Sequence, residues 1–326
     1  MVPKNNITPQ MSKTLIIGAC GQLGTELTIK LRSLNGTENV VAADIVDSPV
    51  KLIEDGPYEQ LNILDNDAYQ SILEKYDVTE VYHLVALLSA KGEQDPLFAW
   101  KLNMDSLLNV LESGRSRVEK IYWPSSIAVF GPDTPPKETP QWTLMNPTTI
   151  YGISKQAGER WCEYYFNKYG VDVRSLRYPG LIGYKAMPGG GTTDYAVDIF
   201  HKAIAGEHFS CFLSENTKLP MMYMEDAVNA TIELMTAPKG NIKVRSSYNL
   251  TAMSFTPEEI ANEIRNHFPD FTISYSPDFR QKIAEGWPQS IDDGQARGDW
   301  GWKHQYDLPK LVSVMIANLK ETIIFD

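Results

Sequence analysis

Short apolar runs recur along the first half of the chain, at intervals that leave room for a helix between them. Residues 14–17, 40–43, 81–86 and 120–123 are mostly aliphatic or aromatic, and residues 172–178 continue the series. Each run has the length of a strand, and unbroken apolar runs are typical of strands buried on both faces. Strands that alternate with helices predict an α/β fold with a doubly wound parallel sheet.

Helical spacing fills the intervals between these runs. Leucines recur at every fourth position from Leu23 to Leu31. Residues 65–76 and 96–113 predict two further helices, and residues 60–63 predict the end of another strand. Because a ligand lies beyond the carboxyl ends of the strands in such sheets, the residues at those ends are the first candidates for a site.

The alternation of strands and helices ends after Tyr178, where the predicted elements become short and irregular. A glycine-rich loop at residues 188–194 leads into a predicted helix at 194–205. Thr256 and Pro257 predict another helix start, with threonine as the cap and proline in the first position. The second half therefore predicts a smaller region that covers the carboxyl edge of the sheet.

Three glycines follow the first apolar run and open the helix after it. Gly18 permits a tight turn, Gly21 lets the backbone approach a pyrophosphate, and Gly24 lets the helix pack close to the strand. The positive end of the helix then faces the diphosphate. A strand, a glycine turn and a helix in that order predict a dinucleotide site.

The second apolar run ends in Asp44, 20 residues beyond Gly24. A carboxylate at this position bonds the adenosine ribose and repels a 2′-phosphate, so it favours NAD over NADP. We therefore predict a Rossmann-like NAD-binding domain at residues 13–180. A disordered extension at residues 1–12 precedes it, and a substrate-binding or cap domain at 181–326 follows, with some segments returning to the core.

Three polar side chains converge on the rim of this predicted site. Ser126 lies at the end of the fifth predicted strand, which begins with the apolar run at 120–123, and Tyr151 and Lys155 stand four residues apart at the head of a long predicted helix. Residues at that spacing share one helix face, so the ammonium is expected to lower the pKa of the phenol. Tyr151 then acts as a general base towards an alcohol, Ser126 holds the reacting oxygen, and Lys155 supports both.

Composition and net charge exclude several classes of binding partner. The 326 residues carry a net charge of −11 and a sequence pI near 5.0, which argues against nucleic acid or an anionic membrane as the main partner. The three cysteines are far apart and indicate neither a disulfide framework nor a zinc site. We predict no membrane span, since no apolar run reaches the length of one. We also predict no metal, with which the few histidines and scattered cysteines are consistent.

Several stretches resemble the L-threonine 3-dehydrogenases of the short-chain type, within the extended short-chain dehydrogenase/reductase superfamily. They include GACGQLGTEL, WPSSIAVFGP, YGISKQAGERWCEYY and GGGTTDYAVDIF, and the resemblance runs from about Lys13 to the end. It implies oxidation of the β-hydroxyl of L-threonine to 2-amino-3-oxobutyrate, with hydride transfer to NAD and without a metal. It also implies a homodimer formed through a four-helix bundle.

The resemblance further assigns residues to each ligand. The implied NAD contacts are Gly18, Gly21, Gln22, Leu23 and Gly24 at the diphosphate, Asp44 at the ribose, Asn62 and Ile63 beside adenine, Ala86 in the groove, Asn103 as a brace, and Tyr151, Lys155 and Tyr178 near the nicotinamide. The implied L-threonine contacts are Ser89, Ser126, Tyr151, Thr192, Thr193, Asp194 and Trp287. From the residues alone, the two threonines could equally hold a carboxylate or belong to an ordinary helix cap.

Two other functions remain open at this point. A nucleotide-sugar epimerase or dehydratase shares the fold and the three catalytic residues, although the second half is short of basic residues for a nucleotide diphosphate. A non-catalytic NAD-binding regulator often lacks the tyrosine or the lysine, whereas Tyr151 and Lys155 are both present here. The first ten residues resemble neither a secretory signal nor a transit peptide, so we expect a cytoplasmic protein, or a mitochondrial one if the source is an animal or a protist.

Overall fold

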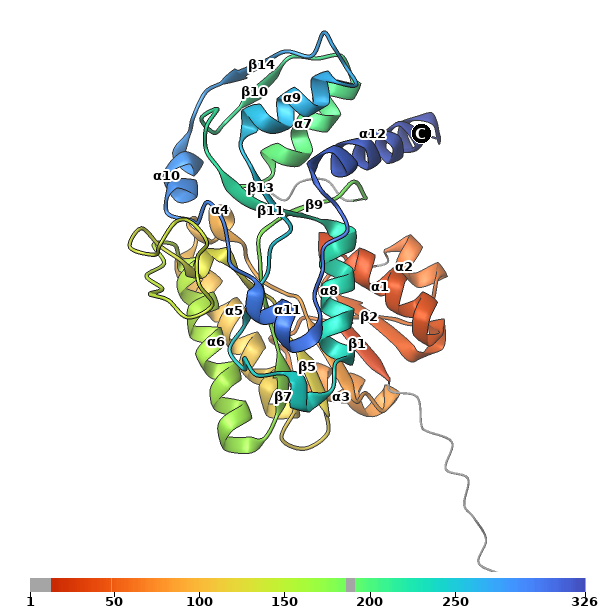
Figure 1. Ribbon diagram of the computed structural model, residues 1–326. Coiled ribbons are helices and arrows are strands. Elements are labelled where there is room, and N and C mark those ends of the chain that lie inside the picture. The colour runs from red at the N-terminus through yellow and green to blue at the C-terminus, as the bar shows by residue number, and fades with distance from the viewer. Residues whose placement is uncertain (1–12, 48, 186–190, 326) are drawn as a thin grey trace, which may run out of the picture.

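The structure is a computed structural model that describes residues 13–47, 49–185 and 191–325. The extension predicted at residues 1–12 lies outside the described residues, and so does part of the glycine-rich loop. A wide lobe built on one large sheet carries a narrower lobe at its upper end (Figure 1). We call the wide lobe the nucleotide lobe and the narrow one the cap.

Six parallel strands form the central sheet, in the order β3-β2-β1-β4-β5-β7. The chain winds outward from β1 in both directions, which confirms the predicted doubly wound parallel sheet. The strands are β1 (Thr14–Ile17), β2 (Val40–Asp44), β3 (Tyr58–Gln60), β4 (Glu80–His83), β5 (Lys120–Tyr122) and β7 (Asp172–Arg174).

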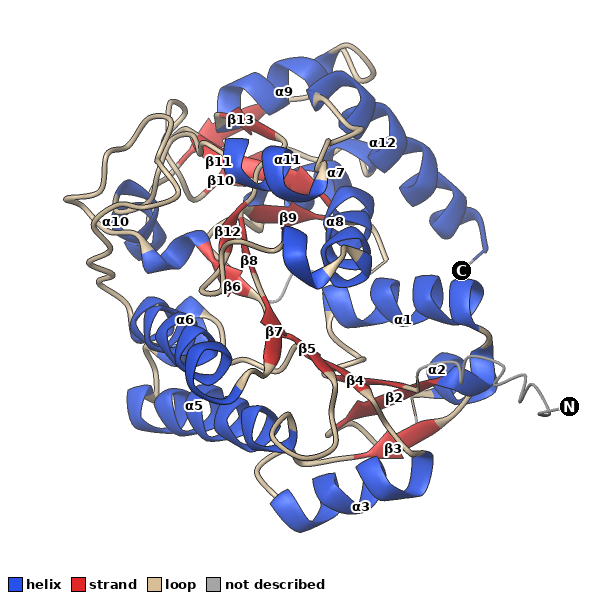
Figure 2. Cartoon of the chain, turned by 60° about the horizontal axis from the view of Figure 1, so that its bottom comes forward, coloured by secondary structure: helices blue, strands red, loops and turns tan. Residues whose placement is uncertain are grey.

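Helices cover both faces of this sheet (Figure 2). Ile16 of β1 points into the core beneath α1 and α8, whereas Leu15 and Ile17 point into the core beneath α3, α5 and α6. Successive strand residues face opposite sides, so unbroken apolar runs fill both cores. The helices are α1 (Gln22–Asn35), α3 (Asn66–Tyr76), α5 (Pro96–Ser113), α6 (Ile150–Tyr169) and α8 (Met224–Thr236).

Local signals place the helix starts where the sequence predicts them. The Asp65 side chain caps α3 by accepting a hydrogen bond from the backbone of Ala68 at 3.0 Å. Helix α5 has the predicted bounds, with Pro96 in its first turn. Thr149 caps α6 by accepting from the backbone of Gly152 at 3.1 Å.

The run at residues 172–178 is two strands, not one. After β7 the chain bends at Ser175, and β8 (Leu176–Tyr178) leaves the central sheet. The Ser175 hydroxyl donates to the hydroxyl of Ser247 at 2.9 Å, which is a contact that the local sequence does not show. Strand β8 forms a small parallel sheet with two short neighbours, β6 (Ser125–Ser126) and β12 (Tyr248–Asn249).

Two other predicted strands end earlier than the sequence predicts. The run at 81–86 is a strand only as far as His83, and the third strand ends at Gln60 instead of extending to residue 63. Both strands lie next to loops at the carboxyl edge, where the backbone leaves the ladder. Leu84 still donates its N–H to the carbonyl of Ile17 at 2.9 Å before the chain turns away.

The cap has a core of its own, separate from the two cores of the central sheet. It contains a three-stranded sheet in the order β13-β11-β9 and a parallel pair of β10 and β14. Its strands are β9 (Gly180–Ile182), β10 (Phe209–Cys211), β11 (Leu219–Tyr223), β13 (Met253–Phe255) and β14 (Ile273–Tyr275). Its helices are α7 (Tyr195–Ile204), α9 (Pro257–Arg265), α10 (Phe279–Glu285) and α12 (Leu308–Phe325).

Some segments of the second half lie in the nucleotide lobe. Helix α8 packs on α1, and β12 and α11 join the same core beneath the sheet. The remaining short elements are α2 (Val50–Glu54), α4 (Ser89–Gly92), α11 (Gly294–Trp300) and the 3₁₀ turns Thr37–Asn39, Ile127–Val129 and Lys239–Asn241. Within the described part of the chain, none of the helices has the length and apolar character needed to cross a membrane.

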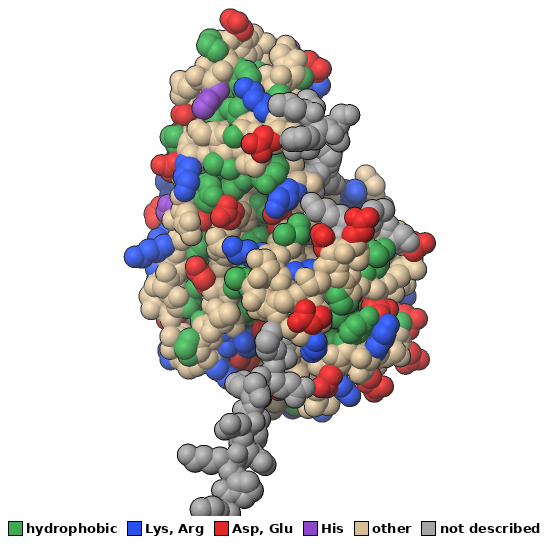
Figure 3. All heavy atoms as spheres, turned by 90° about the vertical axis from the view of Figure 1, so that its right-hand side faces the viewer, with side chains coloured by type: hydrophobic (Ala, Val, Ile, Leu, Met, Phe, Trp, Pro, Cys, Tyr) green, Lys and Arg blue, Asp and Glu red, His purple; other side chains and the backbone are tan. Residues whose placement is uncertain are grey.

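Acidic and basic side chains are interspersed on the face of the molecule shown in Figure 3. Apolar side chains are gathered there near the junction of the nucleotide lobe and the cap. A mixed surface of this kind offers no broad field of positive charge on that face, in agreement with the net charge of −11.

Candidate active site

The glycine turn after β1 has the geometry of a dinucleotide cradle. Gly18 has a φ of +88°, a left-handed conformation that favours glycine. A Cβ on Gly24 would lie 2.1 Å from the carbonyl oxygen of Gly18, so no larger residue fits between α1 and the turn. Gly21 precedes α1 and offers it no side-chain cap, and Gln22 and Leu23 form the helix start. The first N–H groups of α1 are thus directed to an anion instead of a capping side chain.

Asp44 lies beside this turn, at the carboxyl end of β2. Its Oδ2 accepts a hydrogen bond from the backbone of Cys20 at 2.9 Å, which places the carboxylate next to the glycines. Burial, together with the charge of Asp44, raises the pKa of the Cys20 thiol to about 11. Cys20 is therefore a neutral thiol at physiological pH and leaves Asp44 as the charged group of the turn.

The predicted adenine residues differ in exposure. Asn62 is exposed, and its Oδ1 accepts from the backbone of Leu64 at 3.1 Å. Ile63 is buried in the core beneath α3 and α5, and its carbonyl accepts from Asn109 at 3.2 Å. Ile63 thus offers a ligand no exposed side chain. Ala86 is half-buried in the loop after β4.

The structure brings Ser126, Tyr151 and Lys155 together. Ser126 ends β6, and Tyr151 and Lys155 lie in the first two turns of α6. The Lys155 ammonium lies 5.5 Å from the centre of the Tyr151 ring, and the Ser126 side chain is near enough to the Tyr151 phenol to act on its pKa. A hydroxyl, a phenol and an ammonium thus share one place at the carboxyl edge of the sheet.

Burial controls the ionisation of this trio. It raises the pKa of Tyr151 to about 12, although the Ser126 side chain acts in the opposite direction. Burial also lowers the pKa of Lys155 to about 7. The net effect of burial and of Ser126 raises the pKa of the phenol, and the lowering expected from Lys155 stays a prediction.

Two buried rings lie below Lys155. Its ammonium donates to the carbonyl of Pro124 at 2.6 Å and lies 4.5 Å from the centre of the Trp123 ring. His83 is fully buried and bonds the Ser106 hydroxyl through Nε2 at 2.9 Å. Burial and the charge of Lys155 lower the pKa of His83 to about 3, so this imidazole is neutral.

Asn103 braces the site from within the protein. Its Oδ1 accepts from the backbone N–H of Leu87 at 2.8 Å, and its Nδ2 donates to the Ser154 hydroxyl at 3.0 Å. The Ser154 hydroxyl in turn donates to the carbonyl of Tyr151 at 2.7 Å. Asn103 is buried and ties the loop after β4 to the start of α6.

Tyr178 lies beside Ser126 in the register of β6 and β8. Its ring is buried, and its hydroxyl accepts from Tyr122 at 2.6 Å and hydrogen bonds the hydroxyl of Thr231 on α8. Burial raises the pKa of Tyr178 to about 12. Its hydroxyl is thus part of a core network, while its backbone lies at the rim.

The predicted substrate residues come from five separate segments, two of which carry Ser126 and Tyr151. Ser89 begins α4 and is buried, and Thr193 packs its side chain against Gly180 at the start of β9. Thr192 is 1% exposed, and its hydroxyl has no hydrogen-bond partner among the residues that the structure describes. A buried hydroxyl without a partner is costly, which marks Thr192 as a position where a ligand group is expected.

Asp194 and Trp287 complete this set. Asp194 precedes α7 without making a side-chain cap bond, and its carboxylate instead accepts from the backbone of Gly191 at 2.6 Å. Trp287 packs against the cap core and also against the cluster that contains Ile127 and Val129, next to Ser126. Trp287 therefore spans the junction between cap and nucleotide lobe.

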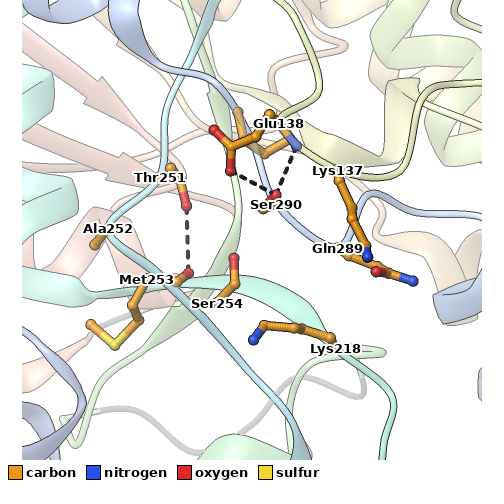
Figure 4. A pocket seen from close by; sticks show the side chains of 10 residues that line it. Lys137, Glu138, Lys218, Thr251, Ala252, Met253, Ser254, Gln289 and Ser290 are labelled. Carbon is orange, nitrogen blue, oxygen red and sulfur yellow. Dashed lines mark hydrogen bonds between the residues drawn. The ribbon is translucent and has the colours of Figure 1, made fainter.

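A separate hollow of about 550 Å³ opens where the loop at residues 137–138 meets β13 and residues 289–291 (Figure 4). Across it, the Ser290 hydroxyl donates to Glu138 at 3.1 Å, and Lys137 and Lys218 stand on two of its sides. None of the predicted site residues lines this hollow. Among the residues with described positions, no group of three or more His, Cys, Asp and Glu side chains could hold a metal ion.

Comparison with known proteins places the chain in a family. Residues 14–251 match the model of the NAD dependent epimerase/dehydratase family. An uncharacterized epimerase/dehydratase of Staphylococcus aureus (strain USA300) is 45% identical over 316 residues, which cover 95% of this chain and 98% of that protein.

Two solved structures are similar over nearly the whole chain. A GalE-like L-threonine dehydrogenase from Cupriavidus necator in its holo form is 56% identical, with a TM-score of 0.92 over 94% of this chain and 99% of that one. An L-threonine dehydrogenase from Clostridium difficile is 46% identical, with a TM-score of 0.93 over 96% and 99%. The chain therefore belongs to the NAD dependent epimerase/dehydratase family and is an enzyme that uses NAD.

Proposed function

We propose that this protein is an L-threonine 3-dehydrogenase, which oxidises the β-hydroxyl of L-threonine to 2-amino-3-oxobutyrate and transfers the hydride to NAD. The observation that carries the proposal is the convergence of Ser126, Tyr151 and Lys155 at the carboxyl edge, in a chain so similar to solved L-threonine dehydrogenases. Thr192, with its buried and unpartnered hydroxyl, supports a small polar substrate beside that trio.

The residues around the glycine turn fit NAD. The space between Gly24 and Gly18 admits no side chain, and the start of α1 has no side-chain cap. Asp44 supplies a carboxylate for the adenosine ribose. When bound, NAD supplies the acceptor for the hydride. We assign the diphosphate to Gly18, Gly21, Gln22, Leu23 and Gly24, and further contacts to Asn62, Ile63, Ala86, Asn103 and Tyr178.

Each catalytic residue has one task in this mechanism. Tyr151 takes the proton of the β-hydroxyl as the hydride leaves the same carbon. Ser126 holds the hydroxyl oxygen by a hydrogen bond and stabilises ionised Tyr151. Lys155 places a positive charge beside the phenol, where the positive charge of oxidised nicotinamide adds to it.

The substrate residues then select the alcohol. We assign Ser89, Thr192, Thr193 and Asp194 to the polar groups of L-threonine, and Trp287 to the side of the substrate that faces the cap. The dipole of α7 favours a carboxylate near its amino end, where the N–H groups of Ala196 and Val197 already bond backbone carbonyls and are not free for a ligand. Packing of Trp287 across the junction keeps water from the reacting carbon.

The test compares substrates directly. NADH formation is measured with purified enzyme, NAD and L-threonine, beside UDP-hexoses and L-serine. We expect turnover with L-threonine only. Turnover of a UDP-hexose without threonine-dependent NADH would replace this proposal by the epimerase alternative. Asp44→Ala is expected to reduce discrimination against NADP by roughly tenfold, because it removes the charge that repels the 2′-phosphate.

We further propose a homodimer formed by α5 and α6. These helices pack together and leave large apolar side chains exposed, namely Leu97, Phe98 and Trp100 on α5 and Ile153, Trp161 and Tyr164 on α6. Pairing with a second copy would bury them in a four-helix bundle. Light scattering should give the mass of a dimer, and Trp161→Glu should give that of a monomer.

We also propose the domain division and the compartment given by the sequence. Residues 13–180 form the nucleotide-binding domain and residues 181–326 mainly the cap, with α8, β12 and α11 returning to the nucleotide core. The cytoplasm is the proposed compartment, or the mitochondrion for an animal or protist source. Localisation of a tagged chain in its own host tests the second point.

A further inference from the structure

A buried ion pair lies directly behind the catalytic trio. Glu159 is fully buried and Arg177 is 3% exposed. The guanidinium donates to both carboxylate oxygens, from Nε to Oε1 at 2.8 Å and from Nη2 to Oε2 at 2.7 Å. Two-point contact of this kind fixes orientation as well as distance. The sequence analysis missed both residues, although a glutamate one turn after Lys155 and an arginine inside an apolar strand are visible signals.

Each member of the pair is next to a residue of the proposed site. Arg177 precedes Tyr178 on β8, and Glu159 follows Lys155 by one turn of α6. The third partner is Ser125, which precedes Ser126 and donates its hydroxyl to Glu159 Oε1 at 2.7 Å. One carboxylate thus joins the strand of the serine, the helix of the tyrosine and lysine, and the strand beside them.

The guanidinium extends the connection to two more segments. Arg177 Nη1 donates to the carbonyl of Gln141 at 3.0 Å and to Oδ1 of Asn249 on β12 at 2.9 Å. Its plane also lies 5.3 Å from the centre of the Phe130 ring. With four hydrogen bonds, the guanidinium is nearly saturated in a place where water does not reach it.

Folding stability alone does not explain why such an ion pair is buried. Desolvation of two charges costs about as much as their attraction returns, and apolar replacements of similar volume are often neutral or stabilising. The fold carries a comparable pair far from the trio, where Asp172 at the amino end of β7 binds Arg174 at 2.9 Å and Arg245 at 2.6 Å. The two pairs differ in what they touch, so they can be compared directly.

The pair also acts on the charges of the site. The titratable groups around Lys155 are Tyr151, Glu159 and Cys162 on its own helix and His83 on β4. The negative charge of Glu159 raises the pKa of Lys155 and so counteracts part of the effect of burial. Arg177 balances that charge, and loss of Glu159 alone would leave an uncompensated positive charge behind the trio.

We propose that Glu159 and Arg177 are positioning residues of the active site, which hold the strand of Ser126 against the helix of Tyr151 and Lys155 and balance the charge behind Lys155. The inference rests on the proposed function, since it concerns the same trio. It goes beyond that function because both residues are buried and neither is assigned to substrate or cofactor. The pair sets the geometry of the proton transfer and not the affinity for NAD.

The test combines Glu159→Gln, Arg177→Met and the double variant with pH profiles of kcat and kcat/KM. Glu159→Gln is expected to lower kcat about 10²-fold, as a misplaced catalytic group does, with the Kd for NAD nearly unchanged. Its pH profile should move to lower pH, because the unpaired Arg177 charge lowers the pKa of Tyr151 and of Lys155. The double variant should return the profile towards that of wild type and regain part of kcat, since no unpaired charge remains.

Asp172→Asn is the matched control. It breaks a pair of the same kind and should lower the unfolding temperature while leaving the pH profile unchanged. If Glu159→Gln fails to fold, Ser125→Ala serves instead: it keeps the pair, and we expect a lower kcat with an unchanged profile and unchanged NAD binding.

Two outcomes would overturn the inference. One is that Glu159→Gln behaves like the control, with lower stability but wild-type kcat and pH profile. The other is that Ser125→Ala leaves kcat unchanged. Wild-type enzyme is assayed in parallel, so absence of threonine turnover in wild type would refute the proposed function instead.

Discussion

The nucleotide lobe and the cap hold their site residues in different ways. In the nucleotide lobe, the backbone positions most of the site. The central sheet fixes the glycine turn, the start of α1 and the end of β2, and the small sheet with β8 and β12 fixes the end of β6. In the cap side of the site, side chains from the loop after β4, the segment before α7 and the segment after α10 must meet. Cofactor binding is thus a property of the fold, whereas substrate choice depends on the contacts between lobes.

The substitution Tyr151→Phe should separate catalysis from cofactor binding more sharply than any other. Removal of the phenol hydroxyl should lower kcat about 10³-fold or more, because no base remains for the alcohol proton. The Kd for NAD should stay within about threefold, since the glycine turn is untouched. NADH formation and fluorescence titration with NADH measure the two effects. Tyr169→Phe, at the exposed end of α6 and not among the side chains assigned to the dimer contact, is the control.

A substitution in the glycine turn should instead weaken cofactor binding. Gly24→Ala places a Cβ 2.1 Å from the carbonyl of Gly18, so α1 must move away from the turn. We expect NAD affinity to fall about 10²-fold, because a shift of α1 misplaces every diphosphate contact. Gly298→Ala is the control, since a Cβ there meets no atom within 4 Å. Equal NAD affinity in the two variants would contradict the assigned cradle.

On the cap side, Thr192→Val tests the unpartnered hydroxyl. If this hydroxyl receives a polar group of the substrate, its loss should raise the KM for L-threonine by roughly 10-fold, which corresponds to about 1.4 kcal/mol. The Kd for NAD and the unfolding temperature should not fall, because the hydroxyl has no partner among the described residues. A lower unfolding temperature with an unchanged KM would assign Thr192 to structure alone.

The smallest expected effect is the change of folding stability with pH that follows from the burial of Lys155. Because the pKa of Lys155 is lowered to about 7 in the folded protein, the unfolded chain binds more protons between that pH and about 10.4. Stability should therefore rise with pH across this window and be lowest below it. Lys155→Met should unfold about 3 °C or more above wild type near pH 6, and the difference should vanish towards pH 10. Thermal unfolding at several pH values measures it.

The same comparison explains what the sequence could predict. The apolar runs of β1 and β2, the glycine spacing and the cap Asp65 are local signals, and they led to the correct sheet and helix starts. Thr149, which caps α6, is a local signal that the prediction did not use. The trio was found because Tyr151 and Lys155 share a helix face and Ser126 ends a strand. These are the features that short-range physics determines.

Long-range contacts account for what was missed. The bend at Ser175 depends on Ser247, and the parallel pairing of β10 with β14 joins segments about 60 residues apart. The raised pKa of Tyr151 follows from its burial, which only the assembled fold produces. The pair of Glu159 and Arg177 is formed across α6 and β8 in the same way.

Trp123 gives the active site an optical reporter. Its indole lies between Gly158, where a Cβ would come within 2.4 Å of the ring, and the ammonium of Lys155. A cation at the face of an indole interacts with its π electrons, so the emission of this ring responds to the charge on Lys155. Among the seven tryptophans of the chain, Trp123 lies next to the lysine that we assign to catalysis, so its share of the emission is expected to change when Lys155 is protonated.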